Sequence, residues 1–182
     1  MEFSDKTEEK LVNEARTNAN AFSELYRRYV KKIYNFFYYH TFNISESEDL
    51  TSITFEKALS HLNTLKPQTN FSAWIYKIAH NSLIDFYRQN NKYKNQQNIE
   101  DIQLITETNF EHDLEKKELV EILVKQLYSL PESYKEVVVL KYQQELSNKE
   151  IGNVIGKSEG AVKQILQRAL KELQRKMSEL KN

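Results

Sequence analysis

Residues 146–171 read LSNKEIGNVIGKSEGAVKQILQRALK and contain all three glycines of the 182-residue chain. Ser147 and Glu150 have the spacing of a capping box, which predicts that a short helix begins there. Gly156 stands where that helix should end, because glycine tolerates left-handed backbone. Ser158 can cap a second helix that continues from Val162. The stretch therefore predicts a helix-turn-helix.

The second helix of this unit combines an apolar stripe with a polar face. The stripe consists of Val162, Ile165, Leu166, Ala169, Leu170, Leu173 and Met177. Lysine, arginine and glutamine are the residue types that contact base edges and phosphates, and a helix N-terminus suits a phosphate. The candidate DNA-binding residues are Lys157, Ser158, Glu159, Gly160, Lys163, Gln164, Gln167 and Arg168. The alternative is a helical hairpin whose polar face is only solvated.

Apolar residues recur at helical spacing over the first half of the chain as well. Helix 20–40 is predicted by Phe22, Leu25, Tyr26, Tyr29, Ile33, Phe36 and Phe37. A helix that begins at Ser45 or Ser47 and reaches residue 63 is predicted by Leu50, Ile53, Ala58 and Leu62. Helix 71–88 is predicted by Phe71, Trp74, Ile75, Ile78, Ala79, Ser82 and Phe86. A short helix over 11–16 should precede them.

The second half of the chain begins with a polar stretch and returns to helical spacing. Leu119, Leu123, Leu127 and Leu130 mark one helix, and Tyr134, Val137, Val138 and Tyr142 mark another after Pro131. We expect an all-α protein of two small helical domains, at residues 1–94 and 119–182, joined by a flexible linker at 95–118. Three glycines and two prolines are too few for the turns of a many-stranded β fold.

Charge is balanced overall but not locally. The chain has 26 basic and 26 acidic residues, which excludes a uniformly cationic DNA-coating protein. Residues 99–122 hold 8 acidic and 2 basic side chains, whereas residues 123–182 hold 7 acidic and 11 basic ones. One hypothesis is that this acidic linker imitates nucleic acid or covers the DNA-binding faces of the free protein. The alternative is a simple tether.

Catalysis and membrane insertion are not expected. The four histidines are scattered without ligand spacing, and no cysteine is present to bind a metal or act as a nucleophile. We therefore expect no catalytic residue, no metal and no cofactor. A charged N-terminus and the absence of a long apolar run predict a soluble, cytoplasmic protein.

Two sets of motifs resemble bacterial RNA polymerase sigma factors of the extracytoplasmic-function (ECF) type, within the sigma-70 family. Region 4 is resembled by Leu130-Pro131-Glu132, Leu146-Ser147, Glu150-Ile151, the run from Ser158 to Lys163, and Arg168-Ala169. Region 2 is resembled by Ala21-Phe22, Leu25-Tyr26, Glu48-Asp49-Leu50, Trp74-Ile75 and Tyr87-Arg88. Departures from the family pattern are Ser52, Ile53, His80 and Gly152.

The resemblance implies a transcription initiation factor that brings RNA polymerase core to promoters. The candidate −35 contacts are those of the helix-turn-helix. The candidate −10 contacts are Lys66, Gln68, Thr69, Asn70, Phe71, Lys77, Asn81 and Arg88. The candidate polymerase contacts are Glu48, Asp49, Ser52, Phe55, Lys57 and His61. Helical spacing alone favours a place in the core for Phe55 and Trp74.

The implied partners are promoter DNA, the beta-prime clamp helices and beta flap of the polymerase core, and an anti-sigma factor. Two other classes of protein stay open at this point. One is a helix-turn-helix regulator that binds an operator without being a polymerase subunit. The other is an interaction protein that sequesters a partner through its first domain.

Overall fold

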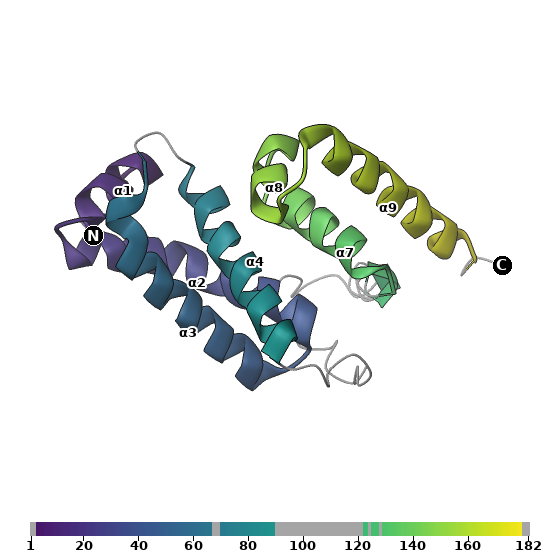
Figure 1. Cartoon of the computed structure of the whole chain (residues 1–182), viewed down its shortest axis with the longest axis horizontal. Helices are drawn as coiled ribbons and strands as arrows, with labels where there is room; N and C mark the ends of the chain where they lie inside the picture. The colour runs from purple at the N-terminus through teal and green to yellow at the C-terminus, as the bar shows by residue number, and fades with distance from the viewer. Residues whose placement is uncertain (1–2, 67–69, 90–121, 124, 128, 180–182) are drawn as a thin grey trace. The chain divides into compact units, whose positions relative to one another are not determined.

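Helices make up the regular structure of the described residues (Figure 1). The computed structural model describes residues 3–66, 70–89, 122–123, 125–127 and 129–179. The chain divides into two compact units, the first built on residues 1–95 and the second on the C-terminal helices. These observations confirm the all-α, two-domain fold class. The expected linker, residues 95–118, lies outside the described residues.

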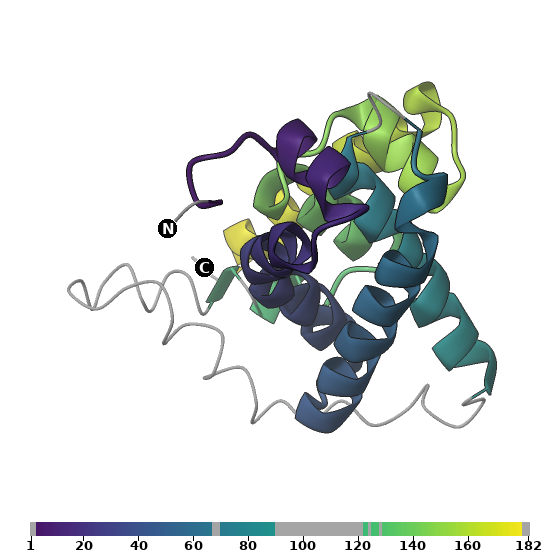
Figure 2. The ribbon, with the colours of Figure 1, turned by 90° about the vertical axis from the view of Figure 1, so that its left-hand side faces the viewer.

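The first unit is a bundle in which α2 is the central helix. Its elements are α1 (Glu8–Ala15), α2 (Ala19–Thr41), α3 (Ile44–His61), the 3₁₀ turn η1 (Leu62–Thr64) and α4 (Phe71–Gln89). α2 packs against α1, α3 and α4. Figure 2 shows α2 and α3 side by side, with α1 beside the first turns of α2. The helices expected over 20–40 and 71–88 are thus confirmed to within one residue at each end.

The core of the first unit is aromatic. Phe36 and Tyr76 are fully buried, and their rings meet edge-on with centroids 5.7 Å apart. Tyr29 packs edge-on against Phe71 at a centroid distance of 5.3 Å. Each such pair adds about 0.5–1.5 kcal/mol to the gain from burial alone. Tyr76 and Leu83 belong to this core, although the expected stripe of 71–88 left both out.

Some residues of the expected stripes lie nearer the surface. Tyr26 is 44% exposed and Ile53 is 41% exposed, while Trp74, Ile78 and Phe86 are half-buried. A period of 3.6 residues identifies the side of a helix that faces the core but not the edges of that side. A residue at such an edge is buried only where a neighbouring helix reaches it.

The start of α3 differs from the prediction. Asn43 is the N-cap, and its Oδ1 accepts a 3.1 Å hydrogen bond from the N–H of Glu46. Ser47 is buried and donates its hydroxyl to the Asn43 carbonyl oxygen at 2.6 Å. Asparagine and serine are nearly equally favourable as N-caps, so the sequence alone does not show which of the two caps the helix. The left-handed residue Phe42, with φ 53°, ends α2, so Asn43 caps α3 and the helix begins at Ile44.

The second unit surrounds a small aliphatic core. Its elements are α7 (Glu132–Val138), the π-helical turn η4 (Val139–Gln143), α8 (Asn148–Ile155) and α9 (Glu159–Glu179). α7 packs against α9. The buried residues include Val137, Leu140, Ile151, Val162 and Leu166.

Three apolar residues that marked the expected helices of the second unit are exposed instead. Leu123 is 46% exposed, Leu170 is 39% exposed and Tyr142 is 58% exposed. Leu170 stands at the edge of the apolar stripe of α9. Residues 122, 123 and 125–127 are helical, as the leucine spacing predicted, whereas Leu119 lies outside the described residues.

The chain leaves α7 through a π-helical turn that the sequence did not predict. The N–H of Gln144 donates to the Val139 carbonyl at 3.3 Å, and the N–H of Leu146 donates to the Leu140 carbonyl at 3.1 Å. Glu145, between them, has a positive φ of 56°. The extra residue lets the chain change direction while Leu140 and Leu146 both stay buried.

Candidate nucleic-acid interface

α8 begins with the capping box that the sequence predicted. The N–H of Glu150 donates to Ser147 Oγ at 3.2 Å, and the N–H of Ser147 donates to Glu150 Oε2 at 2.8 Å. Two backbone donors at the helix start are thereby satisfied. Ile151, the next residue, is fully buried. The cap therefore fixes where α8 begins relative to its buried side.

Two glycines shape the turn that joins α8 to α9. Gly156 has a φ of +70°, the left-handed conformation that the sequence predicted there. The N–H of Lys157 donates to the Gly152 carbonyl at 2.9 Å. A Cβ atom on Gly152 would lie 2.5 Å from the Lys157 carbonyl oxygen. This close approach of backbone explains why glycine stands where the family resemblance leads one to expect alanine.

α9 presents one buried side and one exposed side. Ser158 Oγ caps the helix by accepting a 3.2 Å hydrogen bond from the N–H of Ala161. Val162 and Leu166 are buried on one side. The residues assigned to the −35 surface are all exposed: Lys157, Ser158, Glu159, Gly160, Lys163, Gln164, Gln167 and Arg168. The structure thus brings this predicted set together on one helix and the turn before it.

The cations of α9 differ in their availability along the helix. Lys163, Arg168 and Lys171 are exposed, and none forms an ion pair with another described residue. Arg175, further along, is held by Glu172 at 2.6 Å and by Glu179. Hydrogen bonding to Glu172 raises the pKa of Arg175 above its ordinary value. Lys163, Arg168 and Lys171 therefore keep their positive charge available for a partner, whereas the charge of Arg175 is compensated within the helix.

The segment expected to capture a −10 base is described only at its two ends. Lys66 is exposed at one end. At the other end, Asn70 Oδ1 accepts a 3.2 Å hydrogen bond from a backbone N–H in the first turn of α4. Phe71 is 1% exposed, so its ring belongs to the core, as its helical spacing indicated, and not to the DNA surface that the resemblance implied. Gln68 and Thr69 lie outside the described residues.

Lys77, Asn81 and Arg88 share one side of α4, because their spacings of four and seven residues return to the same side of a helix. Asn81 and Arg88 are exposed, and Lys77 is half-buried. Arg88 Nη1 lies 3.7 Å from Asp85 Oδ1. A surface pair of this kind contributes about 0–1 kcal/mol, so a phosphate can compete for the guanidinium.

The outer side of α3 is acidic. Glu48, Asp49 and Ser52 are exposed as expected, and Glu56 continues the same side one turn later. None of the three carboxylates forms an ion pair with a described residue. This side of α3 therefore has the charge that suits a basic partner.

Two of the expected polymerase contacts point into the unit. Phe55 is 5% exposed and packs edge-on against Tyr26, with ring centroids 4.7 Å apart. Lys57 Nζ donates to Ser82 Oγ at 3.0 Å and so joins α3 to α4. His61 is exposed, and its Nδ1 lies 2.8 Å from the Lys57 carbonyl oxygen. The structure therefore assigns Phe55 to the core, as its helical spacing alone favoured.

Sequence reasoning missed three residues of this surface. Glu56 stands four positions after Ser52, and that spacing alone could have identified it. Ile53 and Leu59 on the same helix are 41% and 56% exposed. No sequence signal marks these two, because an apolar residue on a helix is ordinarily assigned to the core.

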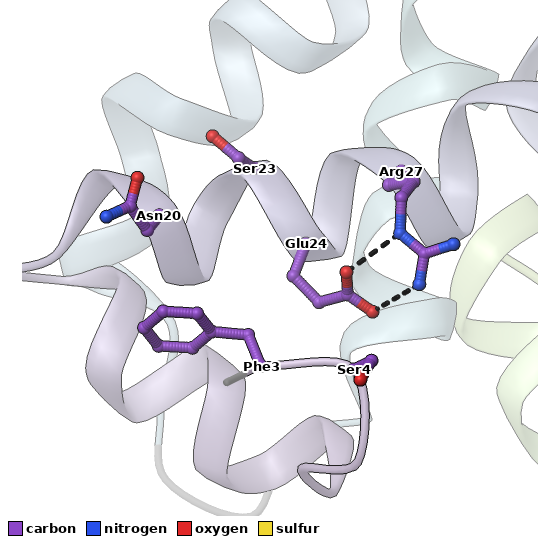
Figure 3. Close-up of a pocket in the computed structure, with 6 residues that line it drawn as sticks. All are labelled: Phe3, Ser4, Asn20, Ser23, Glu24 and Arg27. Carbon is purple, nitrogen blue, oxygen red and sulfur yellow. Dashed lines mark hydrogen bonds and ion pairs between the residues drawn. The ribbon is translucent and has the colours of Figure 1, made fainter. Parts of the chain in front are cut away.

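A hollow of 510 Å³ lies beside the start of α2, and its charged groups neutralise one another (Figure 3). Glu24 accepts hydrogen bonds from Arg27 Nη2 at 2.8 Å and Arg28 Nε at 2.7 Å. These hydrogen bonds lower the pKa of Glu24 from 4.5 to about 2. The lining residues are Phe3, Ser4, Asn20, Ser23, Glu24 and Arg27.

Known proteins resemble the chain along most of its length. Sigma-70 region 2 matches residues 25–93, and Sigma-70 region 4 matches residues 121–173. RNA polymerase sigma factor YlaC of Bacillus subtilis is 32% identical over 162 residues, which cover 87% of this chain and 93% of that protein. ECF RNA polymerase sigma factor SigM of Bacillus subtilis is 29% identical over 152 residues, with coverages of 82% and 91%. This chain belongs to the ECF sigma factors of the sigma-70 family.

As an ECF sigma factor, the protein is a transcription initiation factor that directs RNA polymerase to promoters. The match to region 2 covers the first unit, which an independent helix-turn-helix regulator would not require. The family is in general not one of enzymes. The solved structure of CnrH in complex with the cytosolic domain of CnrY has a TM-score of 0.69 and 23% identity, and covers 93% of this chain and 96% of that one. That likeness supports the fold of this sigma factor.

No helix of this sigma factor, within the described residues, has both the length and the apolar character needed to span a bilayer.

Proposed function

We propose that this sigma factor reads the −35 element with α9, captures the −10 element with the 65–71 segment and α4, and meets the polymerase core through the outer side of α3. The observation that carries this proposal is the division of α9 into a buried apolar side and an exposed side with uncompensated cations.

The −35 surface combines base readout with phosphate contacts. Gln164 and Gln167 have the amide groups that pair with adenine in the major groove, and Arg168 has the fork that pairs with guanine. Lys163 and the start of the helix at Ser158 suit phosphates, which position the protein without reading sequence.

The −10 surface comprises the exposed residues Lys66 and Asn70 of the 65–71 segment and one side of α4. Lys66 and Asn70 flank the segment that would hold an unstacked base. Lys77, Asn81 and Arg88 follow on one side of α4, where cations and an amide suit the backbone of a single strand. Phe71 supports the segment from the core, because it is the buried residue at which the segment ends.

The polymerase surface is the acidic row of α3. Glu48, Asp49, Ser52 and Glu56 form its polar centre, with Ile53 and Leu59 as apolar flanks. We assign this row to the beta-prime clamp helices, and the second unit to the beta flap. Apolar contacts surrounded by charges are usual for helix-packing interfaces between proteins.

An anti-sigma factor is the remaining proposed partner. CnrH was solved in complex with the cytosolic domain of CnrY, and the RpoE of Bartonella quintana was solved in complex with the anti-sigma factor NepR. By analogy, we assign this chain a dissociable inhibitor and a cytoplasmic location. No catalytic residue, cofactor or metal is part of the proposal.

Run-off transcription tests the proposal directly. Purified protein is added to polymerase core and a library of genomic fragments, and we expect transcripts from a defined subset that share two unlike promoter elements. A regulator that is not a polymerase subunit would instead bind duplex DNA alone, usually as a dimer on a palindrome. Folded protein that yields no transcript from any fragment would contradict the proposal.

A further inference from the structure

α1 precedes the residues 25–93 that match Sigma-70 region 2, and none of the surfaces assigned above includes it. Leu11, Val12 and Ala15 are buried on one side of the helix, which packs against α2 and α4. Two polar contacts lie beside this apolar contact. One joins α1 to Leu65 and the other joins α1, through Tyr29, to Phe71, and these two residues are the ends of the 65–71 segment.

The first contact leads to Leu65. Arg16 caps the C-terminus of α1, and its Nη2 donates to the Leu65 carbonyl oxygen at 2.5 Å. Leu65 is 4% exposed, and its own N–H donates to the Leu62 carbonyl at 3.2 Å. Arg16 Nε is buried and has no hydrogen-bond partner among the described residues. Burying a polar atom of a guanidinium is unfavourable. The Arg16 side chain is therefore held where it lies by its hydrogen bond to Leu65, as a specific contact and not as a solvated surface side chain.

The second contact leads to Phe71. The Tyr29 hydroxyl donates to the Glu8 carboxylate. The Tyr29 ring packs edge-on against Phe71, with centroids 5.3 Å apart. Phe71 is the first residue of α4 and is fully enclosed in the core. Glu8 therefore orients the ring against which the far end of the segment rests.

We propose that α1 is a brace that positions both ends of the −10 segment, with Arg16 as the positioning residue for Leu65 and Glu8, through Tyr29, as the positioning residue for Phe71. The inference rests on the proposed role of that segment in base capture. Because Leu65 and Phe71 are already held in place, less conformational entropy is lost at these two residues when a base binds, so binding is stronger and more selective. Arg16 and Glu8 act through other residues and do not contact DNA.

The test measures selection of the −10 base with the full chain on polymerase core. The probe is a promoter fragment found by run-off transcription, opened in advance at its −10 element, together with single-base variants of that element. We expect Arg16→Ala to reduce the preference for the matched base about tenfold, the effect of losing one charge-assisted hydrogen bond. Arg16→Lys keeps a donor and should recover part of the preference. Lys10→Ala removes an exposed cation from the same helix and should behave like the wild type.

Further measurements separate positioning from misfolding and from a wrong site assignment. Arg16→Ala should leave core binding and −35 duplex binding unchanged, and equal losses in all three assays would overturn the brace. Tyr29→Phe removes the hydrogen bond to Glu8 but keeps the ring, and should also reduce the preference for the matched base. If Arg16→Ala fails to fold, the result with Tyr29→Phe tests the brace. Unchanged preference in both variants would overturn the brace alone. A wild type without preference for any −10 base would instead overturn the proposed function of the segment.

Discussion

Gly156 and Gly160 stand four residues apart, and their backbone conformations make different demands on a side chain. Gly156 has a φ of +70°, whereas Gly160 is helical and a Cβ added there would meet nothing within 4 Å. A side chain is therefore strained at the first position and accommodated at the second.

Alanine at each position should shift stability in opposite directions. Gly156→Ala forces a left-handed conformation on a residue with a Cβ and should destabilise the protein by about 1–2 kcal/mol. Gly160→Ala should stabilise it by up to about 1 kcal/mol through helix propensity. Urea unfolding followed by circular dichroism measures both changes. Shifts of the same sign would contradict the geometry of the turn.

Glu24 makes the first unit sensitive to acid. Its pKa is lowered from 4.5 to about 2 because Arg27 and Arg28 hydrogen-bond its ionised form. A lowered pKa contributes stability that is complete above pH 4.5 and is lost as the pH falls towards 2. We expect the difference in melting temperature between wild type and Glu24→Gln to be constant above pH 5 and to narrow below 4.5. If this difference in melting temperature did not change between pH 6 and pH 3, the hydrogen bonds from Arg27 and Arg28 to the Glu24 carboxylate would not stabilise the fold.

At the scale of elements, α9 separates DNA contacts from stabilising ion pairs along one helix. Lys163 and Arg168 have no ion-pair partner among the described residues, whereas Arg175 has two, Glu172 and Glu179. Arg168 and Arg175 therefore form a matched pair of arginines on one helix, in which the environment of the charge differs.

Removing the uncompensated cations of α9 should weaken binding to the −35 element. Lys163→Ala and Arg168→Ala should each reduce the slope of log affinity against log salt concentration by about 0.9 if each contacts one phosphate. Arg175→Ala should leave the slope unchanged. Binding of the polymerase-bound protein to promoter fragments at several salt concentrations measures all three. Equal effects of Lys163→Ala and Arg175→Ala would argue against this DNA-binding side.

Helix ends were predictable where a local signal was unambiguous. The Ser147–Glu150 box and the left-handed Gly156 were correct, because both depend on neighbouring residues only. The predicted N-cap of α3 was wrong by two residues, since Asn43 and Ser45 are equivalent as caps in sequence. The π-helical turn was missed, because it arises from keeping Leu140 and Leu146 buried together.

At the scale of the whole molecule, the division into two units predicts how promoter binding depends on the polymerase. Each unit offers a modest basic surface, and two such contacts add through effective concentration when one partner holds both. The free protein should therefore bind promoter DNA weakly and as a monomer.

Changing the spacing of the two elements tests this dependence. With polymerase core present, inserting 5 base pairs between the −35 and −10 elements, about half a helical turn, should greatly reduce promoter binding because both units cannot then engage. Without core, the same insertion should have no effect. Mobility-shift assays with and without core measure both cases. Tight, spacing-dependent binding by the free protein would contradict the model of two weak contacts.

The amino-acid sequence alone determined the helices, the helix-turn-helix and the outward face of α9, because periodicity, capping and glycine placement act within a few residues. The net charge of zero is a sum over segments of unlike charge, and counting the charged residues segment by segment already reveals the acidic and basic parts of the chain. Only the tertiary structure decided that Phe55 and Phe71 follow their helical spacing and not the contacts that the resemblance implied, that Ile53, Leu59 and Tyr26 are exposed, and that Arg16 reaches Leu65. Those outcomes depend on which helix covers the edge of another, and contacts between residues as distant as 16 and 65 leave no local pattern in a single sequence.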